Sequence, residues 1–147
     1  MENLLWNKSS IKKIVLLTFL LFTISWASAQ TEKPADKKVS EIFEQKFNLG
    51  DFNGIFDMLS TEMKNTLPRK KAIEFFTGIK KESGKIRNQE FENYVRGTFA
   101  SYKTTFENGI YSLDISTNKQ LEITGFYIEA FLENNVGEIK RNSTKLI

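Results

Sequence analysis

The sequence predicts an α+β domain in which N-terminal helices pack on a curved antiparallel β-meander. Apolar residues between positions 39 and 79 recur every three or four residues, which is typical of helices, whereas those between positions 100 and 128 alternate, which is typical of strands. The dipeptide Asn108-Gly109, between two alternating stretches, favours a hairpin. Helices that precede a run of strands indicate α+β rather than an alternating α/β chain.

The first 29 residues have the three-part pattern of a signal peptide in front of this domain. A basic start is followed by an uncharged apolar run over residues 14–24 and by the small-residue site Ala27-Ser28-Ala29. We therefore expect cleavage before Gln30 and export of the mature chain to the periplasm or the medium. The alternative is a membrane anchor, but a spanning helix needs about 20 apolar residues. After cleavage we expect no membrane attachment.

The charge and the two absent residue types exclude several classes of function. The leader carries three lysines and one glutamate, so its removal lowers the net charge from +3 to +1. A nearly neutral domain does not favour nucleic-acid binding, which needs a concentrated basic face. The chain has no Cys and no His, which excludes disulfides, thiolate nucleophiles, His-based triads and ordinary zinc sites. No cofactor and no metal site are predicted.

A flexible lead-in and a first helix open the mature chain. Residues 30–37 are polar and contain Pro34, so we expect the domain itself to span residues 38–131. Asp36 is placed to cap the first helix, and Gly50 is placed to end it in a left-handed conformation. The buried face of this helix is predicted from Val39, Ile42, Phe43 and Phe47.

Two further helical stretches follow the first. Asp51 opens the second, whose apolar face is formed by Phe52, Ile55, Phe56 and Leu59. Ser60 can cap a further short turn through Met63. Pro68 suits the first position of the third helix, and Gly84 lies just past its end. The apolar face of that helix is predicted from Ala72, Phe75, Phe76 and Ile79.

The second half of the domain predicts three or four strands. Strands are expected around residues 91–95, 100–106, 111–116 and 121–128. The Asn108-Gly109 pair predicts a type I′ turn between the second and third strands, because both residue types tolerate a positive φ. The alternation slips at Gly125, which predicts a β-bulge in the last strand.

Several stretches resemble the family called domain of unknown function 3887. They are the segments FNLGDFNGIFDMLSTEMKNTLP (47–68), AIEFF (72–76), GKI (84–86), ASYKTTFENGIYSLDIS (100–116) and ITGFYI (123–128). The resemblance covers about residues 38–131 and implies the cone-shaped fold of the nuclear-transport-factor-2-like, or cystatin-like, superfamily. It implies no activity, and members of the family often precede a hydrolase or peptidase domain. Residues 132–147 are a C-terminal tail or the remnant of a linker, so a stand-alone protein and a truncated copy of a larger enzyme both stay open.

The many phenylalanines support two interpretations. In one they fill the core of a small domain, since each aromatic side chain buries roughly 150–250 Å². In the other some of them line an apolar ligand cavity inside the cone. The residues expected to line such a cavity are Phe43, Phe56, Phe75, Tyr102, Tyr111, Leu113 and Phe126.

No catalytic residue is predicted for the domain. Enzymes on the cone fold join an Asp base to a Tyr donor, but Asp114 shares its strand parity with Ser112 and Ser116, opposite to Tyr111. We therefore expect an exported, non-catalytic accessory or binding domain for an apolar small molecule or a protein partner, with a homodimer through the sheet as a further expectation. The alternatives are the accessory half of a truncated hydrolase or peptidase, and a small cavity enzyme of the isomerase or hydratase type.

Overall fold

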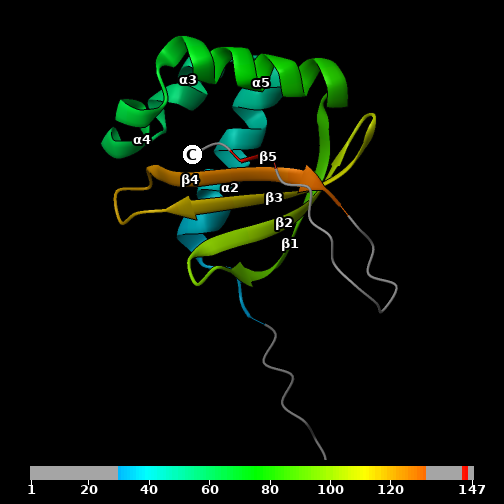
Figure 1. Ribbon diagram of the computed structural model, residues 1–147. Coiled ribbons are helices and arrows are strands. Elements are labelled where there is room, and N and C mark those ends of the chain that lie inside the picture. Colours follow the sequence, from blue (N-terminus) through cyan, green and yellow to red (C-terminus); the bar gives the residue numbers. More distant parts are fainter. Residues whose placement is uncertain (1–29, 132–143, 146–147) are drawn as a thin grey trace, which may run out of the picture.

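The computed structural model describes residues 30–131 and the short strand 144–145 (Figure 1). The leader (1–29) and most of the C-terminal segment (132–143 and 146–147) lie outside the described residues. Within the described part, four helices come first along the chain: α2 (Pro34–Leu49), α3 (Phe52–Asp57), α4 (Thr61–Thr66) and α5 (Arg69–Ser83). They are followed by the strands β1 (Ile86–Val95), β2 (Phe99–Phe106), β3 (Gly109–Thr117), β4 (Ile123–Ala130) and β5 (Thr144–Lys145).

The strands form one sheet whose spatial order equals their order in the sequence, β1-β2-β3-β4-β5. Every neighbouring pair is antiparallel. Helix α2 packs against β1 and β3, α3 packs on α2 and α5, and α4 contacts β4 (Figure 1). The predicted α+β class, with helices ahead of an antiparallel meander, is therefore confirmed.

Phenylalanine rings fill the space between the helices and the sheet. Phe43 of α2, Phe76 of α5 and Phe126 of β4 are almost fully buried. The Phe126 ring centroid lies 5.2 Å from that of Phe43 and 5.4 Å from that of Phe76. Such contacts add about 0.5–1.5 kcal/mol each beyond the burial of apolar area. These rings join elements from both ends of the domain into one core.

The local signals at the ends of the helices are confirmed at three positions. Gly50 ends α2 with a φ of 76°. The side chain of Asp51 accepts a hydrogen bond from the Gly54 amide at the start of α3. Ser60 Oγ accepts one from the Met63 amide at the start of α4. Each of these caps depends on residues within four positions, so the sequence is sufficient to predict them.

The start of the domain differs from the prediction. Helix α2 begins at Pro34, and Asp36 lies inside its first turn instead of capping it. The Asp36 carboxylate is buried, with 5% of the residue exposed, and accepts hydrogen bonds from Tyr94 Oη (2.8 Å) and Thr117 Oγ1. Residues 34–37 are thus helical rather than a flexible lead-in, because two strands of the sheet supply donors for this carboxylate.

The turn between β2 and β3 also differs from the prediction. Phe106 pairs with Gly109, so the turn residues are Glu107 and Asn108, and neither Asn108 nor Gly109 has a positive φ. A type I′ turn at Asn108-Gly109 is therefore wrong, although the hairpin is present. The backbone amide of Asn108 donates to the Ser83 carbonyl at the end of α5 (3.0 Å). This tertiary contact, rather than local propensity, decides the turn.

The bulge predicted at Gly125 is present in β4. The pairing with β3 shifts between Ser116↔Gly125 and Thr117↔Ile123, which leaves Thr124 without a partner. A Cβ atom at Gly125 would come within 2.6 Å of the Phe99 ring. Gly125 is therefore needed for the close approach of this ring to the backbone of β4.

Candidate functional site

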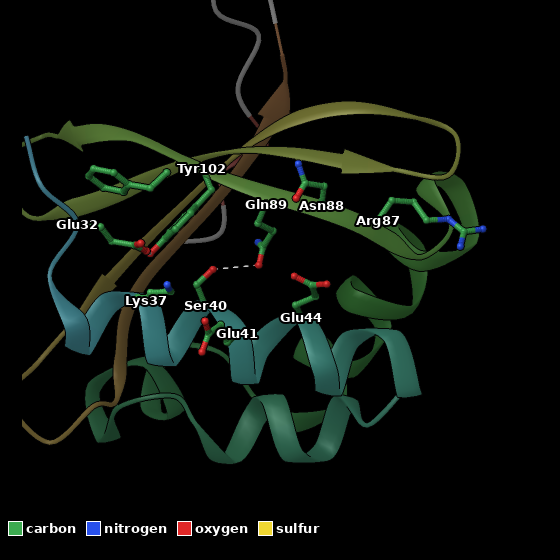
Figure 2. Close-up of a pocket in the computed structure, with 10 residues that line it drawn as sticks. Glu32, Lys37, Ser40, Glu41, Glu44, Arg87, Asn88, Gln89 and Tyr102 are labelled. Atoms are coloured by element: carbon green, nitrogen blue, oxygen red, sulfur yellow. Dashed lines mark hydrogen bonds between the residues drawn. The ribbon is translucent and has the colours of Figure 1, made fainter. Parts of the chain in front are cut away.

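A polar pocket of about 230 Å³ lies between the N-terminal half of α2 and the edge strand β1. Ser40 and Glu44 project from α2 toward the sheet, and Gln89 and Tyr102 project from β1 and β2 toward the helix (Figure 2). The pocket combines carboxylates, amides, basic side chains, a hydroxyl and two aromatic rings. Its lining residues are Glu32, Lys37, Ser40, Glu41, Glu44, Arg87, Asn88, Gln89, Phe91 and Tyr102.

The two walls of the pocket follow from the geometry of their elements. Positions 37, 40, 41 and 44 are three or four residues apart, so they share one face of α2. On β1 the register with β2 shifts between Ile86 and Asn88. The three consecutive residues Arg87, Asn88 and Gln89 all line the pocket at this irregularity. The shift therefore concentrates polar side chains opposite the helix.

Gln89 reaches from β1 to α2 across the pocket. The inward end of the Gln89 amide lies 3.0 Å from Ser40 Oγ (Figure 2). When this end is the amide nitrogen, it also donates to Glu44 Oε2 at 3.2 Å and to the Ser40 carbonyl at 3.3 Å. This orientation satisfies more groups, because the nitrogen then faces oxygen atoms that can accept its hydrogens.

Tyr102 forms the inner wall of the pocket. It is almost fully buried, with 2% of the residue exposed, and its hydroxyl donates to Glu32 Oε1 at 2.8 Å. Burial, followed by the hydrogen bond to Glu32, raises the pKa of the Tyr102 phenol well above its usual range. The phenol therefore stays protonated and acts as a hydrogen-bond donor.

Among the carboxylates of the pocket, Glu44 is the one whose pKa is shifted. Partial burial raises the pKa of Glu44 first, and the negative charge of Glu41 on the same helix raises it further. Within residues 30–131, no lysine or arginine lies within ion-pairing distance of Glu32, Glu41 or Glu44. Three carboxylates thus face the pocket without a cationic partner from the described part of the chain.

The residues that the sequence predicted to line an apolar cavity occupy a different place, with one exception. Tyr102 lines the polar pocket. Phe43, Phe56, Leu113 and Phe126 are buried in the core, where the rings contact one another. Phe75 and Tyr111 are partly buried and pack against the same core.

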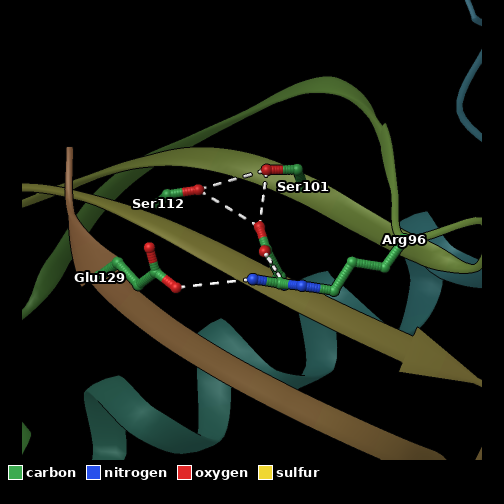
Figure 3. A network of polar contacts seen from close by, with 5 residues as sticks. Arg96, Ser101, Ser112 and Glu129 are labelled. Carbon is green, nitrogen blue, oxygen red and sulfur yellow. Dashed lines mark hydrogen bonds and ion pairs between the residues drawn. The ribbon is translucent and has the colours of Figure 1, made fainter. Parts of the chain in front are cut away.

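A second polar cluster lies on the sheet face that points away from the helices (Figure 3). Arg96 Nη1 contacts Asp114 Oδ2 at 2.8 Å, and Arg96 Nη2 lies 3.6 Å from Glu129 Oε1. Asp114 Oδ1 also accepts hydrogen bonds from the hydroxyls of Ser101 (2.7 Å) and Ser112 (3.2 Å). Asp114 is buried in this cluster, on the face of β3 opposite to the core residues Leu113 and Ile115.

In this second cluster the charge of Asp114 is already paired within the chain. The Arg96 guanidinium lies over the Tyr127 ring, 4.5 Å from the ring centroid, and neutralises the charge of Asp114. The cluster therefore stabilises the loop between β1 and β2. Within the described ranges there is also no group of three or more acidic side chains arranged to hold a metal ion. None of the helices described is long and apolar enough to cross a membrane.

A comparison with family models identifies the family of the chain. Residues 40–126, more than half of the chain, match the family model described as protein of unknown function (DUF3887). The chain belongs to the DUF3887 family. No curated protein and no solved structure matches it. The DUF3887 match covers α2 from Ser40 onward, β1 to β3, and β4 as far as Phe126, so both walls of the pocket lie largely within the family's region.

The pocket residues of this DUF3887 chain were hard to find from sequence. Residues 86–90 were not predicted to be a strand, because the side chains at 87–90 are polar in both parities and give no alternation. The available signal was the acidic and polar face of α2 at positions 37, 40, 41 and 44. That face would ordinarily be interpreted as solvent-exposed helix surface.

Proposed function

We propose that this DUF3887 domain is an exported, non-catalytic binding module and that its ligand site is the pocket between α2 and β1. The observation that carries this proposal is the set of three carboxylates, Glu32, Glu41 and Glu44, facing a cavity in which amide and hydroxyl groups also converge. Small-molecule sites typically combine a preformed concavity with a few oriented polar groups. Because the predicted aromatic residues pack the core, a polar ligand fits this pocket better than an apolar one.

The expectation of export rests on the leader and that of the fold on the family resemblance. The basic start, the apolar run and the site Ala27-Ser28-Ala29 support cleavage before Gln30. Helices on one face of an antiparallel meander agree with a nuclear-transport-factor-2-like fold, which we propose for the domain. N-terminal sequencing of the protein recovered from the periplasm or the medium tests the cleavage site.

The binding role is tested with ligand-observed NMR on the full chain. The probes are hexoses, aliphatic amines, free amino acids and small carboxylates, and saturation transfer from the protein reports binding. Ser40→Phe places a ring in the pocket, whereas Ser40→Ala at the same position leaves the pocket open. We expect at least one class of probe to bind the parent chain and Ser40→Ala, but not a folded Ser40→Phe. Binding that Ser40→Phe leaves intact would place the ligand site elsewhere.

A small cavity enzyme is the second candidate, and one observation favours it. Glu44, with its raised pKa, and the protonated Tyr102 line the same pocket, which resembles the pairing of a proton acceptor with a hydrogen-bond donor. In the same NMR samples, turnover would appear as new ligand signals that grow with time. Their loss in Glu44→Gln, but not in Glu92→Gln on the exposed side of β1, would favour the enzyme.

A protein partner is also part of the proposal. Among the strands described, β1 and β5 are the outer ones, and β1 pairs only with β2. Gln30 and Asn48 accept hydrogen bonds from the Tyr94 and Ile86 amides, and a second copy would pair with the backbone groups between them. The role of an accessory domain beside a hydrolase or peptidase rests on the family resemblance alone. Size-exclusion chromatography with light scattering tests the homodimer, and a strict monomer at high concentration contradicts it.

A further inference from the structure

We propose that Gln30 cyclises to pyroglutamate once the leader is removed, and that the Tyr94 amide at the edge of the sheet promotes the reaction. The inference rests on the cleavage site of the proposed function and adds a covalent modification to it. It combines three observations: the residue type at the predicted cleavage point, the hydrogen bond that its side chain accepts, and the attachment of the following residues to the sheet.

Cleavage before Gln30 creates both reacting groups within one residue. In the precursor the Gln30 nitrogen is a peptide amide, whereas after cleavage it is a primary amine. Such an amine has a pKa of about 7.7–8.0, so part of it is unprotonated near neutral pH. Its lone pair attacks the side-chain carbonyl carbon Cδ, and the bond between Cδ and Nε2 breaks. Nε2 takes one proton from the amine and leaves as ammonia, so no oxidant, metal or second substrate is needed.

A backbone hydrogen-bond donor lies on the carbonyl group that is attacked. The Tyr94 amide of β1 donates to Gln30 Oε1 at 2.7 Å. Negative charge develops on this oxygen when the amine adds to Cδ, and a positioned N–H stabilises that charge. The contact uses the amide oxygen rather than Nε2, which is the atom that leaves. The hydrogen bond therefore favours ring closure.

The residues after Gln30 hold it beside the strand. The Lys33 amide donates to Tyr94 Oη at 2.8 Å, and Tyr94 Oη donates to Asp36 Oδ2 at 2.8 Å. Glu32 accepts a hydrogen bond from the Tyr102 hydroxyl at 2.8 Å. These contacts fix the backbone between Gln30 and α2, so the donor is in place each time the Gln30 side chain approaches it.

The product suits an exported chain whose first residues are bound to the sheet. The lactam keeps the carbonyl oxygen, so the Tyr94 amide at the edge of the sheet still has an acceptor. Cyclisation also removes the free amine that an aminopeptidase recognises. The hydrogen bonds of Glu32 and Asp36 to the strands are thereby protected from trimming of the chain.

The modification is tested on the protein that the cell exports. The full precursor is expressed, and the intact mass of the freshly recovered protein is measured together with the sequence of its N-terminal peptide by tandem mass spectrometry, which needs no free amine. We expect a chain that begins at residue 30 and is lighter than its sequence by one ammonia. Intact glutamine at residue 30 would overturn the inference while the cleavage site stands. A chain that begins elsewhere would overturn both.

The contribution of the Tyr94 amide is measured as a rate. The mature chain is freshly released from a removable tag with glutamine at its N-terminus, and its mass is followed over time. A peptide with the sequence of residues 30–37, which lacks β1, is followed under the same conditions. We expect cyclisation in the folded chain to be about tenfold faster, less than for a donor in a buried site because Gln30 is exposed. Equal or slower cyclisation in the folded chain would overturn the inference.

Gln30→Asn is the matched control, because it keeps the amide and shortens the side chain by one methylene. Ring closure would then need a strained ring that is one atom smaller. We expect exported Gln30→Asn to keep its full mass and to be trimmed by an added aminopeptidase, whereas the parent resists it. Trimming of the parent as fast as that of Gln30→Asn would overturn the inference.

Discussion

Arg96 has an unusual position for a charged residue. Its φ is 50°, in the left-handed region, and it is followed by Gly97 at 80°. A non-glycine residue in this region costs on the order of 1 kcal/mol. The cost is offset by what the conformation achieves, since the guanidinium then reaches Asp114 and stacks on Tyr127. The sequence shows the pair Arg96-Gly97, but the contact between Arg96 and Asp114 could not be predicted from it, because Asp114 is two strands away along the chain.

Replacing Arg96 should therefore leave a buried charge unpaired. We expect Arg96→Met to lower the free energy of unfolding by about 3 kcal/mol, because Asp114 keeps only its two serine donors. Asp114→Asn in the same background should recover part of the loss, since an amide carries no charge. Urea denaturation measures both. Arg69→Met, which breaks an exposed ion pair with Asp57, is the control and should cost less than about 1 kcal/mol.

Glu44 should make the domain less stable as the pH rises toward neutrality. Its pKa is raised on folding, so the folded chain holds this proton more tightly than the unfolded chain does. Stability from this group is present below the unfolded pKa and is lost as the pH rises through the folded value. We expect Glu44→Gln to be more stable than the parent at pH 7, by less than about 1 kcal/mol because solvent screens a partly exposed carboxyl.

The pH dependence is measured by thermal unfolding between pH 3 and pH 8. The difference between Glu44→Gln and the parent should vanish at the acidic end. Glu92→Gln, on the exposed side of β1, serves as the control and should follow the parent at every pH. A Glu44→Gln variant that is less stable than the parent at pH 7 would contradict the prediction.

At the level of elements, some helix ends and turns are decided by neighbouring residues and others by tertiary contacts. The C-terminal end of α2 at Gly50 and the N-terminal ends of α3 and α4 at Asp51 and Ser60 follow from signals a few residues long, and they were predicted from the sequence. The turn at Glu107 and Asn108 was not, because it forms hydrogen bonds to the end of α5. The Asn108 side chain donates to the Glu82 carbonyl, and Glu107 accepts from the Lys85 amide. Type I′ propensity is a preference of an isolated hairpin, and these contacts override it.

The bulge in β4 leads to a prediction about Gly125. A Cβ atom there would collide with the Phe99 ring, so we expect Gly125→Ala to destabilise the domain by about 1–3 kcal/mol. Phe99→Ala in the same background removes the obstacle and should make the added methyl group nearly neutral. Gly78→Ala in α5 is the matched control, because no atom beyond the local helix backbone lies within 4 Å of its Cβ position. It should stabilise the domain by about 0.5–1 kcal/mol. Chemical denaturation of Gly125→Ala, Phe99→Ala, their combination and Gly78→Ala checks these values.

At the level of the whole molecule, periodicity was sufficient for the fold class but not for the pocket. The spacing of apolar residues identifies the helices and strands. Their order along the chain then implies that the helices form one layer and the sheet another. The pocket depends on where α2 meets β1, and both walls are polar. Nothing in the sequence states that positions 37–44 and 87–91 face each other. For the same reason the predicted start of the domain at residue 38 missed the contacts of Gln30, Glu32 and Asp36 with β1, β2 and β3.

These contacts predict a large effect of a short truncation. A chain that begins at residue 38 lacks Asp36 and Glu32, so Tyr94, Thr117 and Tyr102 lose hydrogen-bond partners. Each buried group left unpaired costs about 1–3 kcal/mol. We expect this chain to unfold at a clearly lower temperature than one that begins at Gln30, as followed by circular dichroism. Equal melting temperatures would show that residues 30–37 are the dispensable lead-in that the sequence suggested.

The contacts between the β2–β3 turn and the end of α5 also bear on the order in which the molecule folds. They join residues close in the chain, as does the pairing of β2 with β3, so few residues must be closed into a loop to form them. Helix α2 reaches β3 only across most of the domain. We therefore expect α5 and the hairpin to be structured in the folding transition state and α2 to join afterwards. Substitutions in the hairpin would then slow folding, whereas those on the buried face of α2 would mainly accelerate unfolding.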